Sequence, residues 1–472
     1  MSLKQTLPAI AGVAATGIAG RWAAVRNVVS YQGRQLEVGN LATLGLGEVA
    51  CRVATLVAFV HLARTLTPGG YGQIELSLAI LMILTLVVDQ GLGTFGTREV
   101  AREPRLAGSY TSRVILLQLA AAAFVLVGTV LVCSFAPLDR TLKILLIGYS
   151  ASLLGFPFYL QWLFQGLRQM RRVALPQVLR WSLFTALVFV LVKEPNDILM
   201  IPLSEIIAVT AGAALFLFYL SRLGRQRSAA GSAGILPARG SQSSRLRPTI
   251  DIADSTSRQD ACAPSKVSMM KESLPIGGSN LIWAMRMYLP TVLVGIMATQ
   301  TTVGYFGTAH RVLMAFQTFV NVYFMNLLPL VTEKMHRSPG QVAELIRRSA
   351  ILTATACLLM AAAITVSARS LIGLIFGEVY ARSQSPVLLS VVIWVIPVFV
   401  LRNHARSVLI AMGRQRVEMI CSLVGLIGLI GAGTVLTAFY GAAGTAWTMI
   451  GSEILATSLS WAAVKYHWNL GK

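Results

Sequence analysis

Long apolar runs alternate with short polar segments along the whole chain. Twelve of these runs approach or exceed the ~20 residues that a membrane-spanning helix needs. They lie at about 40–63, 74–97, 114–135, 142–165, 173–192, 199–220, 274–298, 305–331, 349–366, 386–410, 417–438 and 442–464. Because the runs are continuously apolar and do not alternate residue by residue, they predict helices and not the strands of a membrane barrel.

The composition agrees with a membrane location. Of the 472 residues, 55% are hydrophobic and 12% are charged, which is half the charge of a soluble protein, about 25%. This balance excludes an ordinary soluble enzyme, a fibrous protein and a disordered chain. The predicted fold class is an all-α polytopic membrane protein with 12 transmembrane helices.

The basic residues are distributed unevenly between the two sides of the predicted spans. The chain has 40 Lys and Arg against 19 Asp and Glu. Thirty of the basic residues lie on the side of the N-terminus, six on the opposite side, and four inside spans. Because Lys and Arg collect in cytoplasmic loops, both termini and the central loop are predicted to be cytoplasmic. Topology therefore explains the net charge of +21, and we expect no nucleic-acid partner.

Motifs for catalysis, metals or nucleotides are missing from the sequence. The five cysteines are scattered without CxxC or Cys/His ligand spacing, so neither a disulfide framework nor a metal site is predicted. The sequence contains no GxxxxGK[ST] motif for a nucleotide. We therefore expect a protein that is not an enzyme, has no cofactor, and draws on an ion gradient, the membrane potential or product consumption outside.

The two halves of the chain carry short matching segments. Ser204-Glu205-Ile206 recurs as Ser452-Glu453-Ile454, and Asn40-Leu41 and Asn280-Leu281 open the first and seventh runs. A duplicated six-helix unit with both copies in the same orientation is therefore predicted. The expected domains are an N-terminal extension 1–39, an N-lobe 40–220, a cytoplasmic loop 221–272, a C-lobe 273–466 and a cytoplasmic tail 467–472.

The loop at 221–272 is rich in Ser, Arg, Ala and Gly, a composition typical of disorder. Residues 230–240 can be encoded by DNA that is the reverse complement of codons for 255–265. We hypothesise that the loop translates an inserted inverted repeat; the alternative is a basic segment that binds anionic lipid head groups.

An ordered set of short motifs between about 40 and 466 resembles the Wzx-type polysaccharide flippases. The turn His61–Gly72 is similar to the turn after their first helix, and Asp89–Gly93 followed by Thr97-Arg98-Glu99 is similar to the end of their second. The set is completed by Phe164–Arg168, Val303–Ala309 with Pro329, Phe376–Tyr380, Ala411–Gly413 and Gly441–Gly444.

That family belongs to the multidrug/oligosaccharidyl-lipid/polysaccharide (MOP) exporter superfamily. The resemblance implies two pseudo-symmetric six-helix lobes around a central cavity, as in multidrug and toxin extrusion (MATE) transporters. It implies a protein of the bacterial inner membrane that flips undecaprenyl-pyrophosphate-linked oligosaccharide to the outer leaflet for surface polysaccharides such as O-antigen. The implied partners are this substrate, membrane lipids and the polysaccharide polymerase machinery.

Charged residues inside the spans are the candidate transport site, because an ionisable group in a membrane is costly unless it faces a cavity or a partner. Glu48 and Arg52 form a polar stripe with Thr55 on the first span. A guanidinium suits phosphate, so we predict that Arg52 and Arg286 face each other across the cavity and bind the pyrophosphate. Arg311 is a further candidate, and a purely structural Glu48–Arg52 pair is the alternative.

Three carboxylates, Asp89, Glu205 and Glu453, are candidates for ion coupling, because a buried carboxylate can cycle its charge. A structural role is the alternative for each of them. Arg180 is expected to reach the cytoplasmic surface.

Three other functions are weighed against a flippase for oligosaccharide. A drug/cation antiporter of the same superfamily would need an acidic or aromatic cavity, whereas Arg52, Arg286 and Arg311 favour an anionic cargo. A lipid II flippase would carry two further C-terminal helices. A membrane polymerase or ligase would carry a large outer loop, and the longest outer segment here is 367–385.

Overall fold

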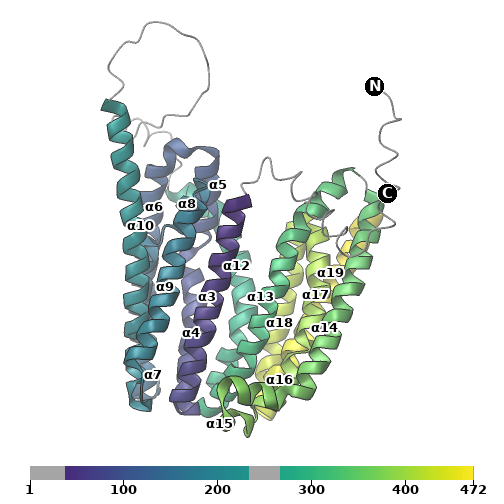
Figure 1. Cartoon of the computed structure of the whole chain (residues 1–472). Helices are drawn as coiled ribbons and strands as arrows, with labels where there is room; N and C mark the ends of the chain where they lie inside the picture. The colour runs from purple at the N-terminus through teal and green to yellow at the C-terminus, as the bar shows by residue number, and fades with distance from the viewer. Residues whose placement is uncertain (1–37, 233–265, 338, 471–472) are drawn as a thin grey trace, which may run out of the picture.

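The computed structural model of the chain describes residues 38–232, 266–337 and 339–470, and every regular element in these ranges is a helix (Figure 1). The first group comprises α3 (Val38–Thr65), α4 (Pro68–Asp89), α5 (Leu92–Arg102), η2 (Pro104–Leu106), α6 (Ala107–Phe135), α7 (Arg140–Ser152), η3 (Leu153–Phe158), α8 (Gln161–Gly166), α9 (Met170–Leu191), η4 (Pro195–Leu199) and α10 (Met200–Ser232). We call this group the N-lobe.

The second group, the C-lobe, follows residues 233–265 and also consists of helices within the described residues. It comprises α12 (Lys266–Met297), α13 (Gln300–Arg337), α14 (Pro339–Phe376), α15 (Glu378–Ala381), α16 (Ser385–Val392), α17 (Val395–Ala411), α18 (Gln415–Tyr440) and α19 (Ala442–Leu470). Figure 1 shows the two lobes close together at one end and leaning apart toward the other.

The helices confirm the predicted all-α membrane protein. Within the described residues, ten segments are long and apolar enough to cross a membrane, counting Arg140–Gly166 and Ser385–Ala411 as single segments. They correspond to the second to eleventh predicted runs. The first and last runs form α3 and α19, which are helical but do not belong to these ten.

The predicted run 74–97 is not one helix. Gln90 (φ 49°) and Gly91 (φ 77°) adopt the left-handed conformation and separate α4 from α5. Glycine reaches this conformation without steric cost. A side chain on Gly91 would also meet α12, since an added Cβ would lie 2.5 Å from the backbone nitrogen of Gly277. The break therefore lets α4 and α5 lie directly against the C-lobe.

The long central loop is shorter than 221–272, because α10 continues to Ser232 and α12 already begins at Lys266. The rest of the hypothesised insertion (233–265) and nearly all of the predicted N-terminal extension 1–39 (residues 1–37) lie outside the described residues. The start of α3, the end of α10 and the end of α19 share one end of the molecule, which we call the terminal end (Figure 1).

The opposite end, called the distal end, holds the turns between α3 and α4 and between α12 and α13, and here the lobes are joined. Arg64 on α3 donates to the carbonyl oxygens of Leu374 (2.5 Å) and Ile375 (3.0 Å) at the end of α14. Gly72 and Gly304 bring the backbones of α4 and α13 together, since an added Cβ on Gly304 would lie 2.1 Å from the Pro68 carbonyl oxygen. The distal end is therefore closed by direct contacts between the lobes.

Candidate functional site

A pocket of about 290 Å³ lies between the two lobes. The N-lobe contributes side chains from α3, α4 and α9, and the C-lobe contributes side chains from α12 and α13. Its charged lining residues are Arg52, Glu75 and Arg311, and its aromatic ones are Phe59, Trp181, Tyr288 and His310. The lining residues thus include two guanidiniums and one carboxylate. We call it the inter-lobe pocket.

Arg311 on α13 reaches across to the N-lobe. Its Nε donates to the carboxylate of Glu75 on α4 and lies 3.1 Å from the hydroxyl of Tyr71. The guanidinium carbon lies 3.2 Å from the ring centroid of Phe59 on α3. The Arg311 and Glu75 side chains are 13% and 8% exposed, so this ion pair between the lobes is largely shielded from water.

Arg52 lies in the same pocket but is exposed. It projects from α3, one helical turn before Thr55, which also lines the pocket and donates to the Cys51 carbonyl oxygen (2.7 Å). The predicted stripe of Arg52 and Thr55 therefore does face a cavity. Glu48, the third member of the stripe, lies on α3, and its side chain is outside the described part of the structure.

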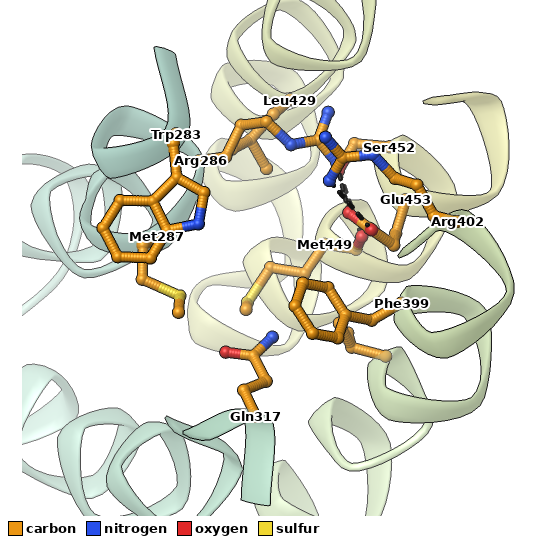
Figure 2. A pocket seen from close by; sticks show the side chains of 11 residues that line it. Trp283, Arg286, Met287, Gln317, Phe399, Arg402, Leu429, Met449, Ser452 and Glu453 are labelled. Atoms are coloured by element: carbon orange, nitrogen blue, oxygen red, sulfur yellow. Dashed lines mark hydrogen bonds and ion pairs between the residues drawn. The ribbon is translucent and has the colours of Figure 1, made fainter. Parts of the chain in front are cut away.

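A second, smaller pocket of about 40 Å³ lies wholly within the C-lobe, and Figure 2 shows its lining. Arg286 on α12 and Arg402 on α17 both bind Glu453 on α19; the distance from Arg402 Nη1 is 3.2 Å. Arg402 Nη2 also donates to the Ser422 hydroxyl at 2.7 Å, and Arg286 Nη1 donates to the Ser422 carbonyl oxygen at 3.3 Å. We call this the C-lobe pocket.

The predicted face-to-face arrangement of Arg52 and Arg286 is replaced by a different one. The two residues line different pockets, and Arg311 shares the inter-lobe pocket with Arg52. Arg286 has its own carboxylate partner in Glu453, so its charge is balanced inside the C-lobe. The physical reason is that a guanidinium in an apolar helix is stabilised by a carboxylate on a neighbouring helix, and α19 supplies Glu453 beside Arg286.

The candidate ion-coupling carboxylates all have partners. Glu205 on α10 binds Arg180 on α9, so Arg180 does not reach out to the cytoplasmic surface as expected. Asp89 accepts hydrogen bonds from the backbone N–H of Gly93 (3.1 Å) and from Gln118 Nε2 (3.0 Å), which ties the break after α4 to α6. Glu205 and Glu453 each lie in the last helix of a lobe and bind arginines of that lobe.

Two charged residues that line the pockets, Glu75 and Arg402, are not among the candidates from the sequence. Glu75 lies at the start of the second predicted run, 74–97, whereas in the structure it lies two turns inside α4, which begins at Pro68. Arg402 is one of the thirty basic residues that the sequence assigns to the cytoplasmic side, yet it is 8% exposed in the middle of α17. Both residues are isolated charges within or next to an apolar run. A search for every such charge, including those close to the estimated ends of a run, would identify both.

Comparison with known sequences places the chain among proteins of polysaccharide synthesis and transport. Residues 38–335 match the family described as "Polysaccharide biosynthesis protein". A Shigella dysenteriae protein whose name gives O-antigen transport as its proposed activity is 27% identical over 162 residues. The aligned part is 34% of this chain and 40% of that protein, so it spans well under half of the relative.

Solved structures show the same fold at low sequence identity. An inward-facing multidrug resistance MATE transporter of the MOP superfamily superimposes with a TM-score of 0.69 at 13% identity, covering 88% of this chain and 94% of that one. The lipid II flippase MurJ in an inward closed conformation gives a TM-score of 0.65 at 11% identity, covering 89% and 87%. These similarities confirm the predicted two-lobed, MATE-like transporter fold.

Proposed function

Since the chain belongs to the polysaccharide biosynthesis protein family, we propose that it carries a lipid-linked oligosaccharide from the cytoplasmic to the outer leaflet of the bacterial inner membrane. The lipid carrier is undecaprenyl pyrophosphate, and the glycan serves surface polysaccharide such as O-antigen. The name of the relative from Shigella dysenteriae refers to O-antigen transport, which supports this kind of cargo. Such a carrier needs no cofactor and makes or breaks no covalent bond.

One observation carries the proposal: the inter-lobe pocket places Arg52 and Arg311 against a single carboxylate, Glu75. A pyrophosphate must cross a region of low dielectric constant, where unbalanced charge is costly, and fixed cations lower that cost. Guanidiniums also bind phosphate oxygens through two parallel hydrogen bonds. Arg52, which is exposed in the pocket, is the residue that we propose meets the pyrophosphate first.

The ion pair between Glu75 and Arg311 gives the pocket a second role in this proposal. It joins α4 of the N-lobe to α13 of the C-lobe near the closed distal end. A pyrophosphate that binds Arg311 competes with Glu75 for the same guanidinium. Cargo would therefore loosen a contact that holds the distal end closed, and a ligand shifts a conformational equilibrium only through such a difference in contacts.

A drug/cation antiporter is the competing function within the superfamily. An organic cation in the inter-lobe pocket would meet two guanidiniums, and its one carboxylate is already bound to Arg311. The charge of the pocket thus favours an anionic cargo. The carboxylates proposed for ion coupling, Asp89, Glu205 and Glu453, would have to leave their present partners in order to bind a proton or sodium.

Ligand binding to the purified protein in lipid nanodiscs tests this function. We expect farnesyl pyrophosphate linked to a disaccharide to bind the wild-type protein more tightly than tetraphenylphosphonium does. Arg52→Ala should lower the affinity for the pyrophosphate compound about tenfold or more, as expected for loss of a charge-assisted contact. Arg382→Ala, in an exposed ion pair with Glu378, is the matched control. Tighter binding of the organic cation would contradict the proposal.

A further inference from the structure

The C-lobe pocket has a lining that its ion pairs do not explain. Besides Arg286, Arg402 and Glu453, apolar side chains form its walls, among them Met287, Met449 and Phe399 (Figure 2). Between these walls the amide of Gln317 on α13 points into the pocket (Figure 2). A polar group in apolar surroundings is costly unless it is hydrogen-bonded, so the position of Gln317 calls for an explanation.

Gln317 is 5% exposed, and its Oε1 is buried without a hydrogen-bond partner within the described residues. Glu453 already binds both Arg286 and Arg402, although Arg402 Nε is buried without a hydrogen-bond partner within the described residues. An incoming anion would have to displace Glu453 from these arginines. Among the described lining residues, the vacant acceptor is therefore Gln317 Oε1 and the vacant donor is Arg402 Nε.

The size of the pocket limits what can enter. Its 40 Å³ compares with the ~10–15 Å³ that one water molecule requires on the same scale. A sugar ring is too large for this space, whereas a substituent of three or four heavy atoms fits. A hydroxyl group would satisfy Gln317 but leave the Met and Phe walls uncovered. A hydrocarbon chain would cover the walls but leave the amide unpaired.

We propose that the C-lobe pocket binds the acetamido group of an N-acetylated sugar in the cargo, with Gln317 as the residue that recognises it. The acetamido N–H donates to Gln317 Oε1, and the methyl group contacts Met287, Met449 and Phe399. This inference rests on the proposed function, because it takes the sugar to be attached to the pyrophosphate held in the inter-lobe pocket.

The two pockets are suitably arranged for one such ligand, because α12 and α13 line both of them. Tyr288 and Arg311 face the inter-lobe pocket, while Met287 and Gln317 face the C-lobe pocket. Arg311 and Gln317 are six residues apart on one helix, a rise of about 9 Å. Trp283, 42% exposed at the edge of the C-lobe pocket, offers an aromatic face on which the apolar side of the sugar ring can lie.

Three ligands that differ in one feature test the inference on the full-length protein in nanodiscs. They are farnesyl pyrophosphate, the same compound linked to N-acetylglucosamine, and the same compound linked to glucose. We expect the N-acetylglucosamine compound to bind the wild-type protein about tenfold more tightly than the glucose compound, the scale of one hydrogen bond and one buried methyl group. Gln317→Leu should abolish this preference and leave the affinity for farnesyl pyrophosphate unchanged.

Asn321→Leu is the matched control, because Asn321 lies one turn further along α13 and does not line the pocket. The Asn321→Leu protein should prefer the N-acetylglucosamine compound over the glucose compound as strongly as the wild type does. Equal affinities for the two sugar compounds in the wild-type protein would overturn the inference, as would a preference that survives Gln317→Leu. Failure of farnesyl pyrophosphate itself to bind would refute the proposed function and the inference together, so the two failures are distinguishable.

Discussion

Glu75 and Arg311 form an ion pair although 236 residues separate them, and the pair joins α4 of the N-lobe to α13 of the C-lobe. Gly307, one turn before Arg311 on α13, makes room for the carboxylate, because an added Cβ there would lie 2.6 Å from Glu75 Cγ. The ion pair thus requires the close approach of α4 and α13, and it in turn stabilises that approach. Any movement that separates the lobes at the distal end must break this contact.

Glu75→Gln should therefore favour opening of the distal end. The change leaves the buried guanidinium of Arg311 without a countercharge, a loss that costs about 3–5 kcal/mol in buried pairs. Since about 1.4 kcal/mol is a tenfold change in population, the effect should be visible in a distance distribution. Spin labels attached through Arg140→Cys and Val379→Cys, both at exposed distal positions, should move apart when measured by electron–electron double resonance.

Glu344→Gln is the control for this measurement. Glu344 also binds arginines, Arg347 and Arg348, but on the exposed surface of α14, where ion pairs contribute little. The label distances should stay as in the wild type. Unchanged distances in the Glu75→Gln protein would mean that the ion pair does not hold the distal end closed.

Substitutions of Arg52 should separate charge from hydrogen-bonding geometry. Arg52→Ala is expected to abolish export of glycan while the protein still inserts into the membrane. Arg52→Lys should restore part of the export, because an ammonium group keeps the charge but loses the two-pronged contact with phosphate. Surface polysaccharide and membrane protein levels are measured together. Wild-type export by Arg52→Met would show that the cation is dispensable.

Gly425→Ala should disturb the C-lobe pocket without changing any charge. An added Cβ on Gly425 would lie 1.9 Å from Arg286 Nη1, so the guanidinium must move away from Glu453 and Ser422. Overpacking of this kind costs about 1–3 kcal/mol, and we expect a lower unfolding temperature in detergent. Gly431→Ala on the same helix meets no atom within 4 Å and should leave that temperature unchanged or raise it slightly. An equal response of both variants would refute the steric argument.

The orientation of the molecule in the membrane can be tested at two exposed arginines. Arg222 near the end of α10 and Arg140 at the start of α7 are both exposed. The distribution of basic residues predicts that Arg222 is cytoplasmic and Arg140 is outside. A membrane-impermeant maleimide applied to intact cells should label the Arg140→Cys variant and spare the Arg222→Cys variant. The reverse pattern would invert the proposed topology.

The sequence predicts the positions of the helices better than it predicts which helices pack together. Continuous apolar runs predict the fold class, because a segment in lipid must hydrogen-bond its own backbone groups and does so as a helix. The predicted run 74–97 passes over the break at Gln90–Gly91, although the polar and glycine-rich segment Asp89–Gly93 is typical of a turn. The polar stripe of Arg52 and Thr55 does predict a cavity-facing side of α3, because residues three apart share a helix face.

The pairing of charges depends on tertiary structure and could not be predicted. Arg286 and Arg311 are both isolated charges inside apolar runs. Arg286 binds Glu453 within the C-lobe, whereas Arg311 binds Glu75 of the N-lobe. No local pattern distinguishes these cases, because the choice follows from which helix lies beside each arginine. The predicted meeting of Arg52 with Arg286 assumed a symmetry between lobes that the packing does not follow.

The close packing of α12 has a mechanical consequence. This helix starts the second half of the chain, yet it lies against α4 and α5 of the first half along much of its length, from the contact of Gly277 with Gly91 to that of Gly295 with Leu76. It is bound on its other side to the C-lobe through Arg286 and Glu453. If the lobes part, α12 must therefore separate from one of its two neighbours. The boundary between two moving bodies then need not coincide with the boundary of the predicted duplication.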